Sequence, residues 1–134
     1  MRFISRARQL LGELPDGDLT KETLRYLMVN GHTSKRNPVP IDTVVAHLNA
    51  IGLCTQRGDL IERKYFQHAV LVPSREESLF IGMFGSFGRG GIYLITDRAD
   101  AAQARDFYLQ RLGREREHLA NLERLIREEW PSDA

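Results

Sequence analysis

The feature that most constrains this chain is a glycine-rich stretch at residues 79–96. Two short apolar runs, at 79–82 and 92–96, flank a tip that holds four glycines. Glycine adopts positive φ without steric cost, so glycines between two runs rich in β-branched and aromatic residues predict a β-hairpin. The tip carries one charge, Arg89, and no acid. We therefore expect a flexible, cationic hairpin that can lie against a phosphate backbone.

Length and composition indicate one small globular domain. The chain has 134 residues, of which 42% are apolar and 28% charged, and this composition excludes the disordered class. The net charge is only +1, from 19 basic and 18 acidic residues, which is low for a nucleic-acid-binding protein. Sixteen of the basic residues are arginine. Arginine suits bidentate contact with phosphate or guanine, although a GC-rich genome produces the same bias.

The sequence predicts a cytoplasmic protein without metal or cofactor. Cys54 is the single cysteine, so an intrachain disulfide is impossible, and we expect it to be a small core residue. The four histidines are isolated and form no zinc-binding spacing with Cys54. No apolar run approaches the ~20 residues that span a bilayer, and the N-terminus lacks the apolar core of a signal peptide.

Helical periodicity and breakers predict two helices in the first 30 residues. Residues 2–14 have an amphipathic pattern, which predicts either a pad that packs on the core or, less favoured, an arm that reaches a partner through its arginines. The second helix is predicted over 20–30, with Thr20 as N-cap and Asn30-Gly31 as its stop.

A loop and a third helix are predicted next. Residues 32–40 contain two prolines and several small polar side chains, which predict a loop that carries Lys35 and Arg36. Apolar residues recur at three- and four-residue intervals over 41–51, which predicts the third helix.

A fourth helix is predicted over 59–72, after a turn at 55–58. Pro73 should end it, because proline donates no backbone hydrogen bond. Its apolar side chains should face the core, and these are Leu60, Phe66, Ala69 and Val70, with Tyr65 as a further candidate. Its outward side, with the preceding turn, should present Gln56, Arg57, Arg63, Lys64 and Gln67. Such a face is either a nucleic-acid-reading surface or a solvated face of an ordinary helical hairpin.

Thr96-Asp97 is predicted to cap a long helix that reaches Trp130, before Pro131 ends it. Its apolar positions alternate three and four apart, close to a heptad pattern, although Gly113 and Glu115 interrupt it. We expect a second copy of the chain to cover its distal half, since a homodimer needs no other partner. The alternative is that the helix folds back on the N-terminal helix. The predicted dimerisation residues are Leu112, Leu119, Leu122, Ile126 and Trp130.

The order of elements resembles the winged helix-turn-helix DNA-binding proteins of bacteria and phages. The resemblance covers about residues 19–110 and rests on the paired helices 41–51 and 59–72 and on the hairpin that leads directly into a helix. It implies a mainly helical α+β fold, with a two-stranded wing and a long C-terminal helix. The predicted parts are an N-terminal helix and turn (1–18), the winged helix-turn-helix domain (19–110) and a C-terminal extension (111–134).

The resemblance implies binding of double-stranded DNA by a dimeric transcriptional regulator. The 59–72 helix would enter the major groove, while Arg89 in the wing would contact the backbone. Lys35 and Arg36 are secondary candidates for phosphate contact. A non-catalytic protein-interaction module is the alternative, because the net charge is near zero.

We do not expect an enzyme. The glycine-rich segment lacks the G-x-S-x-G spacing of a nucleophile elbow, and it has neither the Gly-Lys-Ser/Thr of a P-loop nor a helix directly after its glycines. The carboxylates are scattered over polar helix faces and form no constellation.

Overall fold

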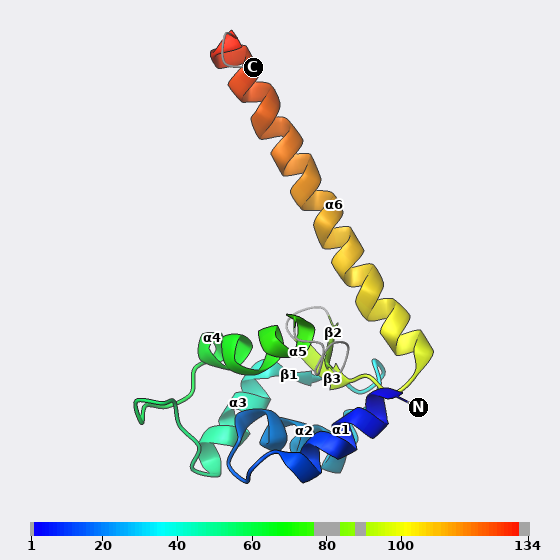
Figure 1. The fold of residues 1–134 in the computed structure, drawn as a ribbon, viewed down its shortest axis with the longest axis vertical. Helices are drawn as coiled ribbons and strands as arrows, with labels where there is room; N and C mark the ends of the chain where they lie inside the picture. The colour runs from blue at the N-terminus through cyan, green and yellow to red at the C-terminus, as the bar shows by residue number, and fades with distance from the viewer. Residues whose placement is uncertain (1, 77–83, 88–90, 132–134) are drawn as a thin grey trace.

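The computed structural model describes residues 2–76, 84–87 and 91–131, with side chains for 5–74, 91–106 and 109–131. It is a mainly helical α+β fold, as predicted, in which a body of short helices and a small sheet gives rise to one long helix that extends away from it (Figure 1). The elements in chain order are α1 (Arg2–Glu13), α2 (Leu19–Val29), β1 (Val39–Pro40), α3 (Ile41–Ala50), α4 (Arg63–Phe66), η1 (Gln67–Leu71), α5 (Val72–Glu76), β2 (Phe84–Phe87), β3 (Gly91–Leu94) and α6 (Arg98–Glu129).

The described strands form a three-stranded antiparallel sheet in the order β1-β3-β2, with β3 in the centre. Phe84 lies opposite Leu94 and Phe87 opposite Gly91, which confirms that this stretch contains an antiparallel pair of strands. The predicted tip was too wide, because 84–87 belong to a strand. The predicted first strand, 79–82, lies outside the described residues.

The third strand, β1, falls in the segment that was predicted to be a loop. Val39 is buried and lies opposite Ile92, and Pro40 lies opposite Gly91. A two-residue strand is too short to show an alternating pattern. Proline is compatible with a strand at the edge of a sheet, where its missing N–H is not needed.

Both faces of β3 are buried. Ile92 and Leu94 pack into the main helical core, whereas Tyr93 and Ile95 pack against Ala101 and Ala104 at the base of α6. Successive side chains of a strand point to opposite faces, so one strand connects the two apolar clusters.

The main core lies between α1, α2, α3 and the continuous helical run 63–76, which we call helix 63–76. Ala7 and Leu10 of α1 are fully or almost fully buried, so this helix packs on the core as a pad.

The N-cap of α2 is Asp18, whose Oδ1 accepts a hydrogen bond of 3.0 Å from the backbone N–H of Lys21, and the prediction of Thr20 as N-cap was wrong. Cys54 is exposed, so its predicted place in the core was also wrong.

Helix 63–76 begins four residues later than predicted, because Asn49 of α3 binds the backbone of Ile61 and keeps it out of the helix. The side-chain amide of Asn49 accepts from the backbone N–H of Ile61 at 2.8 Å and donates to its carbonyl at 2.9 Å. Ile61 is therefore buried, whereas Leu60, which was predicted to face the core, is 75% exposed.

Pro73 does not end this helix, contrary to the prediction. The π-helical segment η1 precedes it, and the N–H of Val72 bonds back five residues to the carbonyl of Gln67. A proline ring clashes with the carbonyl four residues before it and cannot donate to it. The wider π turn is a known way to relieve this conflict, so the helix continues to Glu76.

The long helix α6 confirms the predicted caps. The Oδ1 atom of Asp97 accepts a hydrogen bond of 2.8 Å from the N–H of Asp100, and Trp130 is the C-cap. Residues 105, 106 and 109–130 are all exposed, so α6 does not fold back on α1. Among the described residues, no helix is long and apolar enough to cross a membrane.

We expect Asn49→Ala to lower the free energy of unfolding by about 2 kcal/mol. The variant loses two hydrogen bonds and leaves a partly buried N–H and C=O of Ile61 without partners. Urea denaturation measures the change, with Asn121→Ala on the exposed surface of α6 as the matched control. Equal stability of the two variants would contradict this account of the helix start.

We expect Asp16 to contribute to the acid dependence of stability. Its ion pair with Lys21, at 2.9 Å, is the main cause that lowers the pKa of Asp16, and Arg25 acts in the same direction. A lowered folded-state pKa adds stability that is fully present above the usual carboxyl value, about 4, and is lost as the pH falls through the folded value. Urea midpoints below pH 4 should therefore fall less steeply in Asp16→Asn than in the wild type. A slope as steep as that of the wild type would contradict the assignment.

Candidate nucleic-acid interface

The segment between α3 and helix 63–76 is a closed turn that presents two polar side chains. The N–H of Thr55 donates to the carbonyl of Asp59 at 3.0 Å, and the N–H of Asp59 donates to Thr55 Oγ1 at 3.1 Å. Gly58 closes the turn at φ +85°, a conformation that favours glycine. Gln56 and Arg57, both predicted site residues, are exposed at its tip.

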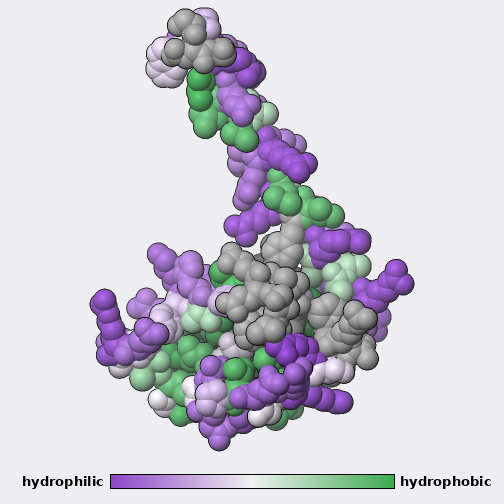
Figure 2. Space-filling model, viewed as in Figure 1, coloured by the Kyte–Doolittle hydropathy of each residue, from purple (hydrophilic) through white to green (hydrophobic). Residues whose placement is uncertain are grey.

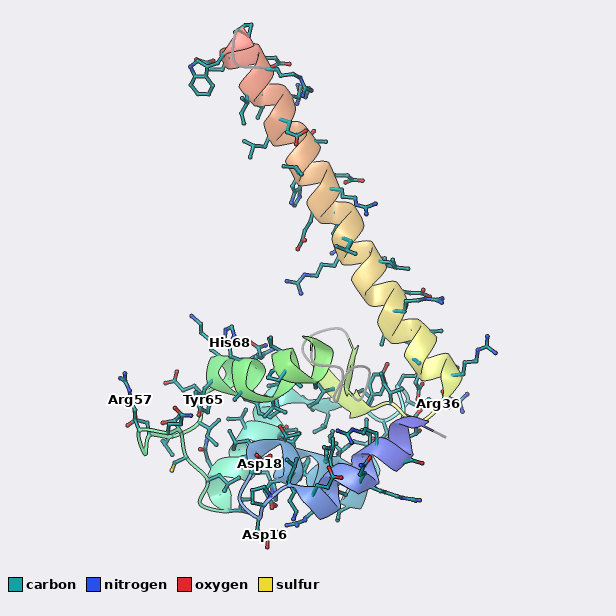
Figure 3. All side chains as sticks on the ribbon, in the orientation of Figure 1. Asp16, Asp18, Arg36, Arg57, Tyr65 and His68 are labelled. Carbon is teal, nitrogen blue, oxygen red and sulfur yellow. The ribbon has the colours of Figure 1, made fainter. Side chains whose placement is uncertain are left out.

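The first two turns of helix 63–76 present the remaining predicted cations. Arg63 and Lys64 are exposed, Gln67 is half-buried, and Phe66 is fully buried in the core. His68 is exposed one turn after Lys64 and lies on the outer side of the helix (Figure 3). The turn and the start of the helix therefore combine Gln56, Arg57, Arg63, Lys64 and Gln67 in one region of the surface.

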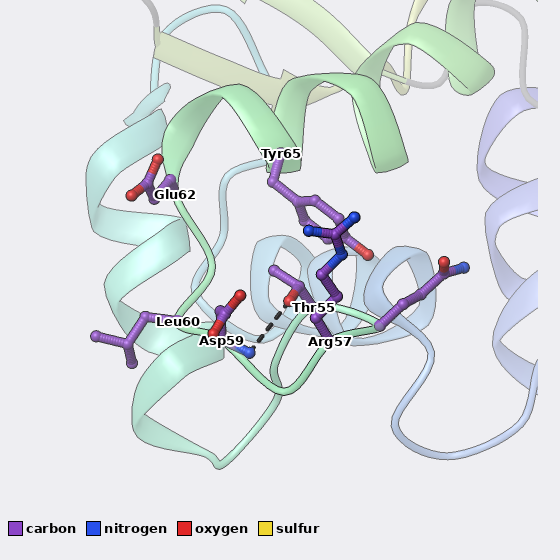
Figure 4. Close-up of a pocket in the computed structure, with 7 residues that line it drawn as sticks. Thr55, Arg57, Asp59, Leu60, Glu62 and Tyr65 are labelled. Atoms are coloured by element: carbon purple, nitrogen blue, oxygen red, sulfur yellow. Dashed lines mark hydrogen bonds between the residues drawn. The ribbon is translucent and has the colours of Figure 1, made fainter.

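A recess of about 380 Å³ lies between this turn and the helix (Figure 4). Arg57 and Tyr65 line it, one from the turn and the other from the helix, and Asp59 and Glu62 contribute carboxylates. The recess also includes Leu60, whose side chain is largely open to solvent. It can accept a flat or elongated group that brings both apolar surface and hydrogen-bonding atoms.

The electrostatics of this surface are mixed. Between residues 55 and 68 there are three basic side chains, Arg57, Arg63 and Lys64, and two acidic ones, Asp59 and Glu62, which gives a local net charge of +1. In addition, Asp42 of α3 lies 3.8 Å from the guanidinium of Arg63. Both partners are largely exposed, so this long ion pair adds little stability and leaves Arg63 free to change partners.

The predicted phosphate contacts in loop 32–38 lie elsewhere. Arg36 and Arg57 are on opposite sides of the body (Figure 3). The loop is held against β3 and the start of α6, because the N–H of Leu94 donates to the carbonyl of His32 and Thr96 Oγ1 donates to that of Thr33. Lys35 and Arg36 therefore do not join the surface formed by helix 63–76. The predicted wing residue, Arg89, lies outside the described residues.

Several residues of this surface were not predicted from the sequence. Tyr65 was considered a further core-facing residue of the 59–72 helix, and His68 was considered only as an isolated histidine. His68 follows Lys64 by four residues, which puts both side chains on the same side of the helix. The signal that could have found the true start is Asn49, a side chain that can bind both polar groups of an extended residue, but its partner is 12 residues away.

The described residues hold no cluster of three or more potential metal ligands. His32 and His47 both pack against Tyr26, with ring centroids 5.9 Å and 4.5 Å from it, and His32 Nδ1 lies 2.9 Å from the carbonyl of Asn37. These contacts account for two of the four histidines as structural side chains.

The predicted dimerisation residues form a second surface, on α6. Apolar side chains are open to solvent along this helix, between charged ones (Figure 2). Exposed large apolar residues of α6 include Leu109, Leu112, Leu119, Leu122, Leu125, Ile126 and Trp130, each 40–56% exposed. Such a row, which no other described part of the chain covers, is typical of an interaction surface.

Comparison with protein-family models finds no matching family. Comparisons with curated proteins and with solved structures likewise find no match.

Proposed function

We propose that this protein binds double-stranded DNA as a winged helix-turn-helix protein, with α3 and helix 63–76 as the helix pair and β2–β3 as the wing. The observation that carries the proposal is the location of the exposed cations. Arg57, Arg63 and Lys64 lie at the turn and N-terminal end of the second helix of the pair. In helix-turn-helix proteins, this end of the second helix contacts base edges in the major groove.

The packing supports this assignment. Phe66, Val70 and Leu71 of helix 63–76 belong to the same core cluster as Ile92 and Leu94 of β3. The helix and the hairpin that would flank it are therefore parts of one rigid unit. A strand before α3 and a hairpin after helix 63–76 also give the sheet order β1-β3-β2, which suits a winged-helix domain.

The side chains suggest a division of roles. Arg63 and Lys64 can donate to guanine or phosphate, and Gln67 can pair with adenine if its half-buried amide rotates outward. Arg57 at the tip of the turn is suited to a phosphate contact. A second copy of the chain, bound through α6, would provide two such surfaces in a dimeric transcriptional regulator.

The mixed charge favours one other function, a protein-interaction module without DNA binding. Asp42, Asp59 and Glu62 surround the cations, and the recess at Tyr65 and Leu60 offers apolar surface. A mobility-shift assay with random-sequence duplex at low salt separates the two functions. A shift at micromolar protein supports DNA binding, and its absence supports the protein-interaction module.

We expect Arg63→Ala and Lys64→Ala each to weaken DNA binding about tenfold at low salt, because each removes one cation from the interface. Both side chains are exposed, so thermal melting of the body should change little. Fluorescence anisotropy with a labelled duplex measures the binding, and a selection from random sequences supplies the specific site.

Arg8→Ala is the matched control. Arg8 is exposed on α1, on the other side of the body from α4 (Figure 1), and its loss should leave DNA binding unchanged. Loss of binding in Arg8→Ala alone would instead favour the arm hypothesis for the N-terminal helix. Unchanged binding in both Arg63→Ala and Lys64→Ala would remove the recognition role from helix 63–76.

Asp42→Asn should have the opposite effect and strengthen DNA binding severalfold. The substitution removes a negative charge that lies 3.8 Å from Arg63 and would repel a phosphate nearby. It also removes an acid from the first turn of α3, which should cost about 0.5 kcal/mol of stability. The same anisotropy titration measures the gain, and binding weaker than that of the wild type would contradict the proposed location of the DNA.

A further inference from the structure

The distal part of α6 needs a partner that the described chain does not supply. The helix has 32 residues, about 48 Å at 1.5 Å per residue, and residues 109–130 are exposed all along it. Helical segments without tertiary contacts are only marginally stable in water, and most helix stability in proteins comes from packing of an apolar face. The exposed apolar residues of α6 offer such a face.

The charges of α6 are divided between its two halves. Residues 105–116 contain four arginines and two acids, a net charge of +2. Residues 117–129 contain two arginines and four glutamates, a net charge of −2. The change of sign falls between Arg116 and Glu117, near the middle of the exposed apolar row, which runs from Leu109 to Trp130.

We infer that α6 pairs with the α6 of a second copy of this chain in the antiparallel direction. An antiparallel pair brings the positive half of each helix against the negative half of the other, whereas a parallel pair brings like charges together along the whole contact. The helix dipoles act in the same sense, because the positive end of one helix meets the negative end of its partner. A twofold axis near residue 119 lets the two apolar rows overlap along their full length.

This orientation determines how far apart the two bodies lie. Each body is attached at the N-terminal end of its α6, so an antiparallel pair holds the bodies at opposite ends of a contact about 33 Å long, for 22 residues. The next step rests on the proposed DNA-binding function. One turn of DNA is about 34–36 Å, so this separation implies two half-sites at least one helical turn apart.

Spin-label distances test the orientation. A label is attached at Gln110→Cys or at Asn121→Cys, each in a Cys54→Ser background, because Cys54 is exposed. In an antiparallel dimer the two labels at residue 110 should be offset by about 28 Å along the helix axis and those at 121 by only about 4 Å, so the 110 pair should be much the farther apart. A parallel dimer has no axial offset at either position, so it would give nearly equal distances for the two pairs and overturn the proposal. A protein that stays monomeric at 50 μM by sedimentation would also overturn it.

Two further measurements examine the contact itself. Leu119→Arg should raise the dimer dissociation constant at least a hundredfold, because each of the two copies loses an apolar side chain from the contact. Ala120→Arg, on the neighbouring face of the helix, is the matched control.

Salt should weaken an antiparallel dimer and strengthen a parallel one, since it screens attraction in the first and repulsion in the second. An antiparallel dimer that fails to shift random duplex would support this pairing while contradicting the proposed DNA binding.

Discussion

The fold depends on the burial of β3 on both of its faces. Side chains of this strand alternate between the helical core and the base of α6, and its backbone pairs with β1 on one edge and β2 on the other. A strand constrained on four sides has one possible register, since a shift of one residue would exchange every side chain between the two clusters. The hairpin, the loop at 32–38 and the start of α6 are positioned through their contacts with it. Helix 63–76 contributes to the same core, so the geometry of the candidate interface follows from that of the sheet.

Asn49 determines where the helix of the candidate interface begins. Its side-chain amide binds both backbone polar groups of Ile61, so residues 59–62 stay outside the helix, and the helix begins at Arg63. If the helix began at Asp59, the first turn would present two acids in place of two cations. The sign of charge at the end of this helix, on which any contact with phosphate depends, thus follows from one side chain of the preceding helix.

The sequence predicted the features that local chemistry controls. The helices of residues 2–13, 19–29 and 41–50 follow from apolar periodicity and breakers, and Asp97 was identified as a cap because its partner is three residues away. The features that it did not predict depend on distant partners. The strand β1 is a strand only because Ile92 pairs with Val39, and the continuation of the helix through Pro73 depends on a π turn that no residue type signals. The cations of the candidate interface were identified as outward-facing, but the acid of α3 next to Arg63 was not, because ion pairs between helices leave no periodic pattern.

The low charge of the candidate interface gives the proposed dimer a role in the proposed DNA binding. Three cations offset by nearby acids can neutralise only a few phosphates, so a single copy would bind DNA weakly and lose much of that affinity at physiological salt. Two copies joined by a stiff helix pair would bind as one unit, and the second contact would then form at a high effective concentration without any new charge. A near-neutral domain with a long unpartnered helix is therefore better suited to specific binding as a dimer than to nonspecific binding as a monomer. The opposite charges of the two halves of α6 would thus serve DNA recognition indirectly, by setting the distance between two weak contacts.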